Sequence, residues 1–204
     1  MMRRLFHDRS GASAAEFAIV LPLLLIFLLG IVDAGRWLWT FNRAEKAAQM
    51  GARFAVVADP VTSAIDSSYL GVGGLTQGDA IPASDFGKIT CTGTGSLSSP
   101  TATCNCTTTP CPTGTDSNDA FKAIVGRMNL LMPEIQPSNV TVTYSSSGLG
   151  YAGNPNGADI SPLVTVTLSG LRFTPITSFL LVSIPMTAAT TSLTAEDLSG
   201  SQSN

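Results

Sequence analysis

The chain has 204 residues, of which only 12% are charged, and its net charge is −3. From Asp59 onward, four basic residues stand against ten acidic ones, and this balance argues against nucleic-acid binding, which needs a basic footprint. The single histidine, His7, precedes a long apolar run, so no histidine beyond that run can activate a Ser or Thr hydroxyl as a nucleophile. We therefore expect neither an enzyme nor a nucleic-acid-binding protein, and we predict no cofactor.

A short basic segment precedes an apolar segment that is long enough to cross a membrane. Residues 1–11 carry three arginines against one aspartate, and residues 12–32 contain Glu16 as their only charge. As a helix, these 21 residues span roughly 30 Å, which matches a bilayer core. Transmembrane helices tolerate a proline such as Pro22. The positive-inside rule predicts a single pass with the N-terminus in the cytoplasm and the remainder outside.

Three interpretations of this N-terminus compete. Ordinary signal peptidase could cut after Ala34, because Val32-Asp33-Ala34 loosely fits the small-residue rule. The segment could also be an uncleaved signal anchor. In the third interpretation, residues 1–11 are a prepilin-type leader that is removed between Gly11 and Ala12. We favour the third, because a carboxylate inside an apolar layer needs a partner, and the new ammonium of Ala12 supplies one for Glu16.

The helix is predicted to continue beyond the membrane to about residue 57. Asp59-Pro60 ends the pattern, because a residue that precedes proline avoids the helical region. Small residues recur at spacings of three and four and form a smooth stripe for a partner helix or for the protein's own head. They are Ala44, Ala47, Ala48, Gly51, Ala52 and Ala55. Residues 12–58 are therefore assigned to one transmembrane and extended helix.

The outer region is predicted to be a small α+β head. Residues 61–115 are rich in Gly, Ser, Thr and Pro, so residues 59–118 are predicted as a loop region with at most short strands. A helix over about residues 119–132 follows a polar N-cap at 116–119, which also resembles a fragment of a calcium loop. Alternating apolar and Thr residues at 140–144 and 163–168 predict strands, and 185–193 a last one. The head, residues 119–204, thus contains one helix and a three- to four-stranded antiparallel sheet.

Four cysteines lie close together in the loop region, at Cys91, Cys104, Cys106 and Cys111. Disulfides are favoured in an exported chain. Their spacing lacks the paired C-x2-C knuckles of structural zinc sites, so we predict no metal. Two disulfides are expected with open connectivity, except that Cys104–Cys106 is disfavoured because so tight a loop strains the bridge. Free or mixed thiols are the remaining alternative.

The first quarter of the chain resembles the TadE-like family, pseudopilins of the tight-adherence (Tad/Flp) pilus assembly system in bacteria. The matching features are Gly11, Glu16-Phe17, Pro22, Asp33, Gly35-Arg36 and Gly51-Ala52-Arg53-Phe54. Phe17 is similar to the pseudopilin branch, whereas the related major pilins have Tyr there and are much shorter. The tail sequences PLVTVTLSGLRFTPI and VSIPMTAATTSLTAED also resemble the closing strands of this family.

This resemblance implies a minor pilin or pseudopilin that takes part in pilus assembly and adhesion by non-covalent helix packing. Gly11 would be the last leader residue, Ala12 the new N-terminus, and Glu16 the charge that pairs during assembly. The implied partners are prepilin peptidase, other pilin and pseudopilin subunits, and membrane lipid. The implied location is the bacterial inner membrane or a surface pilus. The alternative is a signal-anchored extracytoplasmic binding module with a disulfide-stapled head and no polymer role.

Overall fold

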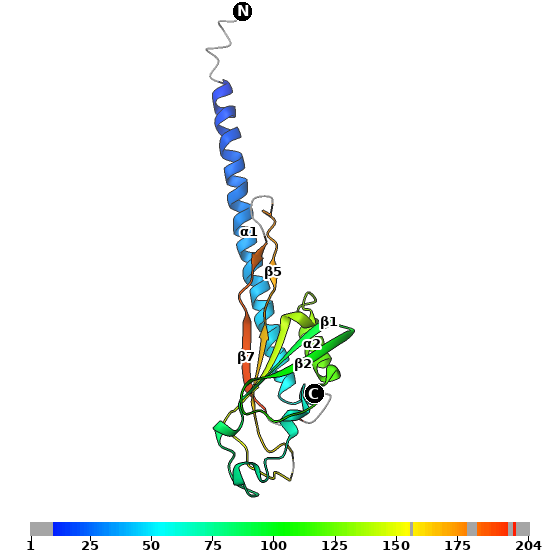
Figure 1. The fold of residues 1–204 in the computed structure, drawn as a ribbon. Helices are drawn as coiled ribbons and strands as arrows, with labels where there is room; N and C mark the ends of the chain where they lie inside the picture. Colours follow the sequence, from blue (N-terminus) through cyan, green and yellow to red (C-terminus); the bar gives the residue numbers. More distant parts are fainter. Residues whose placement is uncertain (1–9, 156, 179–182, 196–197, 199–204) are drawn as a thin grey trace, which may run out of the picture. The chain divides into compact units, whose positions relative to one another are not determined.

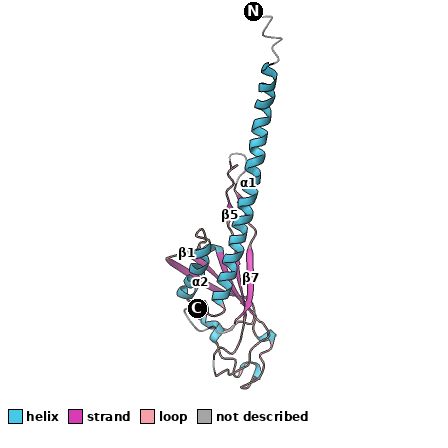
Figure 2. Cartoon of the chain, turned by 180° about the vertical axis from the view of Figure 1, so that it is seen from behind, coloured by secondary structure: helices cyan, strands magenta, loops and turns pink. Residues whose placement is uncertain are grey.

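The computed structural model describes residues 10–155, 157–178, 183–195 and 198, and describes side chains from residue 13 onward. The chain divides into two units. The first contains Met1–Thr40 and Arg172–Ile184, and the second contains Phe41–Leu171 and Pro185–Asn204. Helix α1 (Ser10–Ala55) is continuous and contributes to both units. Figures 1 and 2 show this helix and the strands that follow it.

The second unit is built on a five-stranded antiparallel sheet with the strand order β2-β1-β3-β4-β7. Its strands are β1 (Lys88–Ser96), β2 (Ser99–Thr108), β3 (Val140–Ser145), β4 (Leu163–Leu168) and β7 (Ala189–Thr194). Two residues each form β5 (Arg172–Phe173) and β6 (Ile184–Pro185), which pair separately. The α+β fold class with a long N-terminal helix is confirmed, but the main sheet has five strands rather than three or four.

The strands have one buried and one polar face, as their alternating sequence predicts. Val142 of β3 is fully buried and pairs in register with Cys91 and Val166 on its two sides. The neighbouring positions carry Thr and Ser. Cross-strand hydroxyl contacts join Thr165 to Ser192 at 2.8 Å on this polar face. Strands with one packed face and one polar face give the period-two pattern that identified β3 and β4.

The last turns of α1 supply the helix that packs on the buried face of the sheet. Ala47, Ala48, Ala52 and Ala55 of the small-residue stripe are fully buried. A side chain on Gly51 would lie 2.7 Å from Met128 Sδ of helix α2 (Asn118–Leu131) and 3.3 Å from Val166. The stripe therefore allows α1 to approach both α2 and the sheet closely. The stripe predicted from the sequence is occupied by the protein's own head.

Helix α2 has the N-cap predicted from its sequence. Ser117 accepts a hydrogen bond from the Ala120 amide at 3.2 Å, which satisfies one of the unpaired donors at the helix start. At the other end of α2, Arg43 of α1 donates from Nε and Nη2 to the Leu131 carbonyl at 3.1 and 3.0 Å. Asp116 accepts from the Cys104 amide on the free edge of β2 at 2.9 Å. The Asp116 carboxylate therefore satisfies a backbone donor on the edge strand of the sheet.

The hairpin β1–β2 corrects the prediction that residues 61–115 form loops with at most short strands. These strands have nine and ten residues. Their core-facing positions include Gly93, Pro100 and Ala102, which carry little hydrophobic signal. Gly93 leaves space for the ring of Phe121, which lies within 2.2 Å of where a Cβ would be. Tertiary packing thus makes strands of a sequence whose composition favours loops.

All four cysteines are paired in two disulfides, which agrees with the bonds expected of an exported chain. Cys91 and Cys104 are directly opposite each other on β1 and β2 and are bonded. Cys106 is bonded to Cys111 across a separation of five residues. This connectivity, which the sequence left open, joins the two strands of the hairpin and then closes the segment that follows β2.

Asp159 organises the loops of the second unit. Its carboxylate accepts hydrogen bonds from the amides of Tyr69, Gly153 and Asn154 at 2.6–3.0 Å, and from the Ser68 hydroxyl at 3.3 Å. Burial acts to raise the pKa of Asp159, but these donors outweigh burial and hold its pKa below the ordinary value. Segments that are about 90 residues apart in the sequence thus meet at one carboxylate.

Candidate functional site

The first part of α1 exposes an apolar surface on all sides. Its most apolar 18-residue window has a mean hydropathy of 2.7, and none of it is buried. Phe17 is 64% exposed, Leu23 66% and Phe27 66%. Among the described residues, one helix is long and apolar enough to cross a membrane, and α1 is that helix. A helix that is hydrophobic all round needs lipid or other helices to cover it.

Glu16 lies on this exposed apolar part of α1. Gly11 and Ala12 lie in the first turn of the same helix, which begins at Ser10. The predicted leader residues 1–9 lie outside the described part of the chain. The structure therefore places Glu16 about one helical turn from Ala12. Cleavage after Gly11 and the pairing of Glu16 with an ammonium stay predictions.

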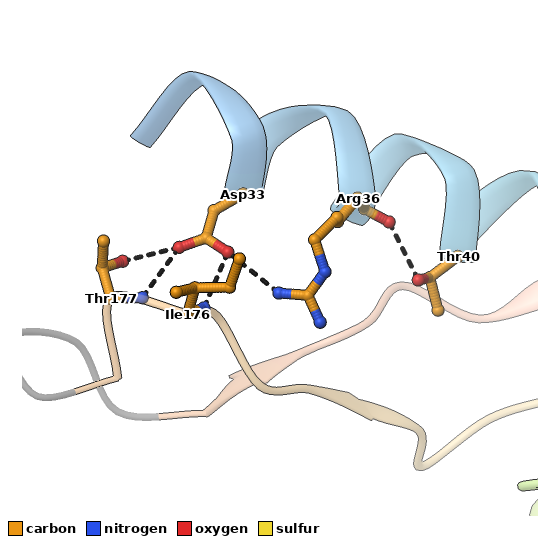
Figure 3. Close-up of polar contacts among 5 residues, drawn as sticks. All are labelled: Asp33, Arg36, Thr40, Ile176 and Thr177. Atoms are coloured by element: carbon orange, nitrogen blue, oxygen red, sulfur yellow. Dashed lines mark hydrogen bonds and ion pairs between the residues drawn. The ribbon is translucent and has the colours of Figure 1, made fainter. Parts of the chain in front are cut away.

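Asp33 follows the apolar run and binds a segment that is far away in the sequence (Figure 3). The residue is buried, with 7% exposure. Oδ1 accepts from the Ile176 amide at 2.7 Å and from Arg36 Nη1 at 3.1 Å. Oδ2 accepts from the Thr177 amide at 2.9 Å and from the Thr177 hydroxyl at 2.8 Å. One carboxylate thus receives four hydrogen bonds and joins residue 33 to residues 176 and 177.

We call the described residues 172–178 and 183–184 the strap, which Asp33 holds against α1. Arg36 donates to Asp33, and its guanidinium lies 5.4 Å from the ring centroid of Phe173, within the range of a cation–π contact. Arg172 joins the two limbs of the strap, because its Nε and Nη2 donate to the hydroxyl and the carbonyl of Ser183 at 3.0 Å. The Ser178 amide donates to the Pro175 carbonyl at 3.2 Å. Helix and strap are therefore linked by charge, hydrogen bonds and ring contact.

An open groove of about 510 Å³ lies between α1 and the strap within the first unit. Its walls are predominantly apolar, with Asp33 and Thr177 at one side. The helix contributes Gly30, Ala34, Trp37 and Leu38, and the strap contributes Phe173, Pro175 and Ile184. Ile176 and Ile184 of the strap are 48% and 41% exposed. The groove and these two isoleucines extend the apolar surface of the helix beyond Val32.

Comparison with known proteins gives one match, to the family described as TadE-like protein, over residues 11–53. The N-terminal region is TadE-like. The match begins at Gly11 and ends at Arg53, so it includes Glu16, Asp33 and Arg36. No curated protein and no solved structure matches the chain. The resemblance predicted from the sequence is confirmed over this segment, and it supports a protein associated with a Tad pilus.

The structure gives a physical reason for part of the TadE-like pattern. Asp33 and Arg36 were noted in the sequence as motif residues without a role, and they form the junction that holds the strap. Their partners Ile176 and Thr177 were missed. No local sequence signal marks them, because two of the three bonds come from backbone amides, which any residue other than proline has, and the third comes from the hydroxyl of Thr177 in a chain rich in Thr. The pattern in the tail, which lies outside the matched segment, stays a prediction.

Proposed function

We propose that this TadE-like protein is a minor pilin or pseudopilin of a tight-adherence pilus, with a structural rather than a catalytic role. The observation that carries the proposal is the continuous helix α1. Its first part is exposed and apolar, and its last turns are buried in the head. Such a helix joins a folded head to a segment that must be covered by lipid or by neighbouring helices. Residues 11–53, which match the family, include both parts.

The proposed mechanism begins with cleavage by a prepilin peptidase between Gly11 and Ala12. The chain then has a free ammonium about one helical turn from Glu16. An unpaired carboxylate costs about 2.5–3.5 kcal/mol at the centre of a bilayer on insertion scales, and less near its edge. Pairing with the ammonium of the same or a neighbouring subunit offsets part of this cost and fixes the register between helices. The partners are then pilin subunits, and the head lies on the extracytoplasmic side.

N-terminal sequencing of the membrane-extracted protein tests the cleavage. We expect the mature chain to begin at Ala12, and we expect the Gly11→Glu variant to keep its full length. A chain that begins at Met1 supports an uncleaved anchor, and one that begins at Gly35 supports an ordinary signal peptide. Either result overturns the pilin proposal.

The Glu16→Gln variant tests the pairing. It should insert into the membrane and be cleaved, yet fail to co-purify with other pilus components or to support attachment. Glu16→Asp should restore these properties only in part, because its side chain is one methylene shorter. Glu45→Gln, which removes a carboxylate farther along the same helix, is the matched control and should behave as the wild type. Attachment of Glu16→Gln cells at the wild-type level would contradict the mechanism.

A further inference from the structure

We infer that the strap is a second membrane-contacting element, with Ile176, Ile184 and the apolar groove facing the acyl chains and glycerol region of the leaflet on the side of the head. This inference rests on the proposed membrane residence of α1. It assigns to lipid a surface on the C-terminal half of the chain that the family match does not reach.

The position of the groove along the helix places it at the boundary of the bilayer. The apolar run ends at Val32, and the helix residues that line the groove extend from Gly30 to Leu38. At 1.5 Å per residue, they cover about 12 Å along the axis. The polar layer on each side of a hydrocarbon core is about 5–7 Å thick. The groove therefore begins inside the hydrocarbon and extends through the polar layer, while Ile176 is bonded at the level of Asp33.

The hydrogen bonds of the strap fit a partly apolar surrounding. A backbone amide that enters lipid must find its partner within the protein. Asp33 accepts from the amides of Ile176 and Thr177, and the Pro175 carbonyl accepts from Ser178. The backbone amides of Ile176, Thr177 and Ser178 are therefore satisfied without water. The exposed side chain at the centre of this turn is an isoleucine rather than a polar residue.

The composition around the strap also favours lipid. The sequence from Phe173 to Ala195 contains no charged residue, whereas exported surfaces that face water usually do. Trp37 lines the groove, and the neighbouring Trp39 is 68% exposed. Tryptophan is enriched at the level of lipid headgroups. The charged residue of the strap is Arg172, and its guanidinium donates to Ser183.

Depth-dependent quenching in vesicles tests the inference. The full chain, with Trp37→Phe and Trp39→Phe, receives one tryptophan in each variant and is reconstituted in phosphatidylcholine vesicles that contain brominated acyl chains. Ile176→Trp and Ile184→Trp probe the two limbs of the strap. Phe27→Trp, inside the apolar run, is the positive control. Leu70→Trp, which replaces an apolar residue of the second unit that is 51% exposed, is the control for exposure alone.

We expect bromolipid to quench the fluorescence of Phe27→Trp strongly. Both strap variants should be quenched most when the bromine lies near the glycerol, and the fluorescence of Leu70→Trp should be unquenched. Quenching of Phe27→Trp without quenching of either strap variant would overturn the inference and leave the membrane helix intact. In that case, protection of the strap from aqueous acrylamide would indicate a protein neighbour, and free access would indicate water. If Phe27→Trp is also unquenched, the proposed membrane residence fails, and the inference fails with it.

Discussion

Gly93→Ala is expected to destabilise the head, because the added methyl would overlap the ring of Phe121. An ideal Cβ on Gly93 would lie 2.2 Å from Phe121 Cε1 and 2.6 Å from Cζ. Carbon atoms in contact prefer about 3.5–4.0 Å, so the ring or the strand must move by about 1.3 Å. Phe121 is fully buried, and overpacking of this kind costs about 1–3 kcal/mol. Reduced freedom of the unfolded chain offsets about 0.4–1 kcal/mol, so the midpoints of the two ranges give a net loss of about 1–2 kcal/mol.

Hydrogen exchange of the detergent-solubilised full chain, followed by mass spectrometry, measures this loss. A change of 1–2 kcal/mol corresponds to exchange about 5–30-fold faster in the most protected amides, and we expect these in β3. Gly126→Ala is the matched control, since no atom lies within 4 Å of its Cβ position in α2. It should stabilise the helix by about 0.5–1 kcal/mol and slow exchange. Unchanged protection of β3 in Gly93→Ala would refute the packing argument.

Three further predictions concern the disulfides and two carboxylates. Replacing the Cys91–Cys104 disulfide by two alanines should lower the urea midpoint of the head more than the same change at Cys106–Cys111. The two disulfides close loops with sequence separations of 13 and 5, and the lost entropy raises the free energy of the unfolded chain by about 3 and 2 kcal/mol, respectively. Equal midpoints would contradict this order. Because the pKa of Asp159 is lowered in the folded state, the stability it supplies is present above its ordinary pKa of about 4 and is lost as the pH falls through the folded value. Asp159→Asn should therefore flatten the pH dependence of stability below about pH 4, and an acid titration with an unchanged slope would count against this. Asp33→Asn replaces an acceptor by a donor, so peptide-resolved exchange should show faster exchange in the strap and unchanged protection in β3.

The sequence predicted the structure best in segments where each side chain faces a single environment, either apolar or polar. The run around Glu16 is uniformly apolar. Its length predicts a helix that crosses a membrane, and its single charge predicts that Glu16 pairs with another group. Strands β3 and β4 alternate Val with Thr because one side packs and the other does not, and their bounds follow within a residue. Helix α2 likewise has its apolar residues at helical spacing and its cap at Ser117.

Features that depend on distant partners could not be predicted. The core-facing Gly93 leaves space for the ring of Phe121, and this role is visible only in the folded structure. No pattern in the sequence indicates that the two residues are in contact. Two of the three bonds from Ile176 and Thr177 to Asp33 use backbone amides, which the identity of the side chain does not reveal. Asp33 was visible as part of a family pattern, but its role became visible only in three dimensions.

The junction at Asp33 also sets an order of events during synthesis. Asp33 is made 143 residues before Ile176, which corresponds to about 7–30 s at 5–20 residues per second. Throughout that interval, the carboxylate has none of its partners from the strap. In a chain that ends before residue 176, Asp33 keeps its ion pair with Arg36 but lacks the three hydrogen bonds from Ile176 and Thr177. The junction between α1 and the strap is therefore completed only after residue 177 has been synthesised.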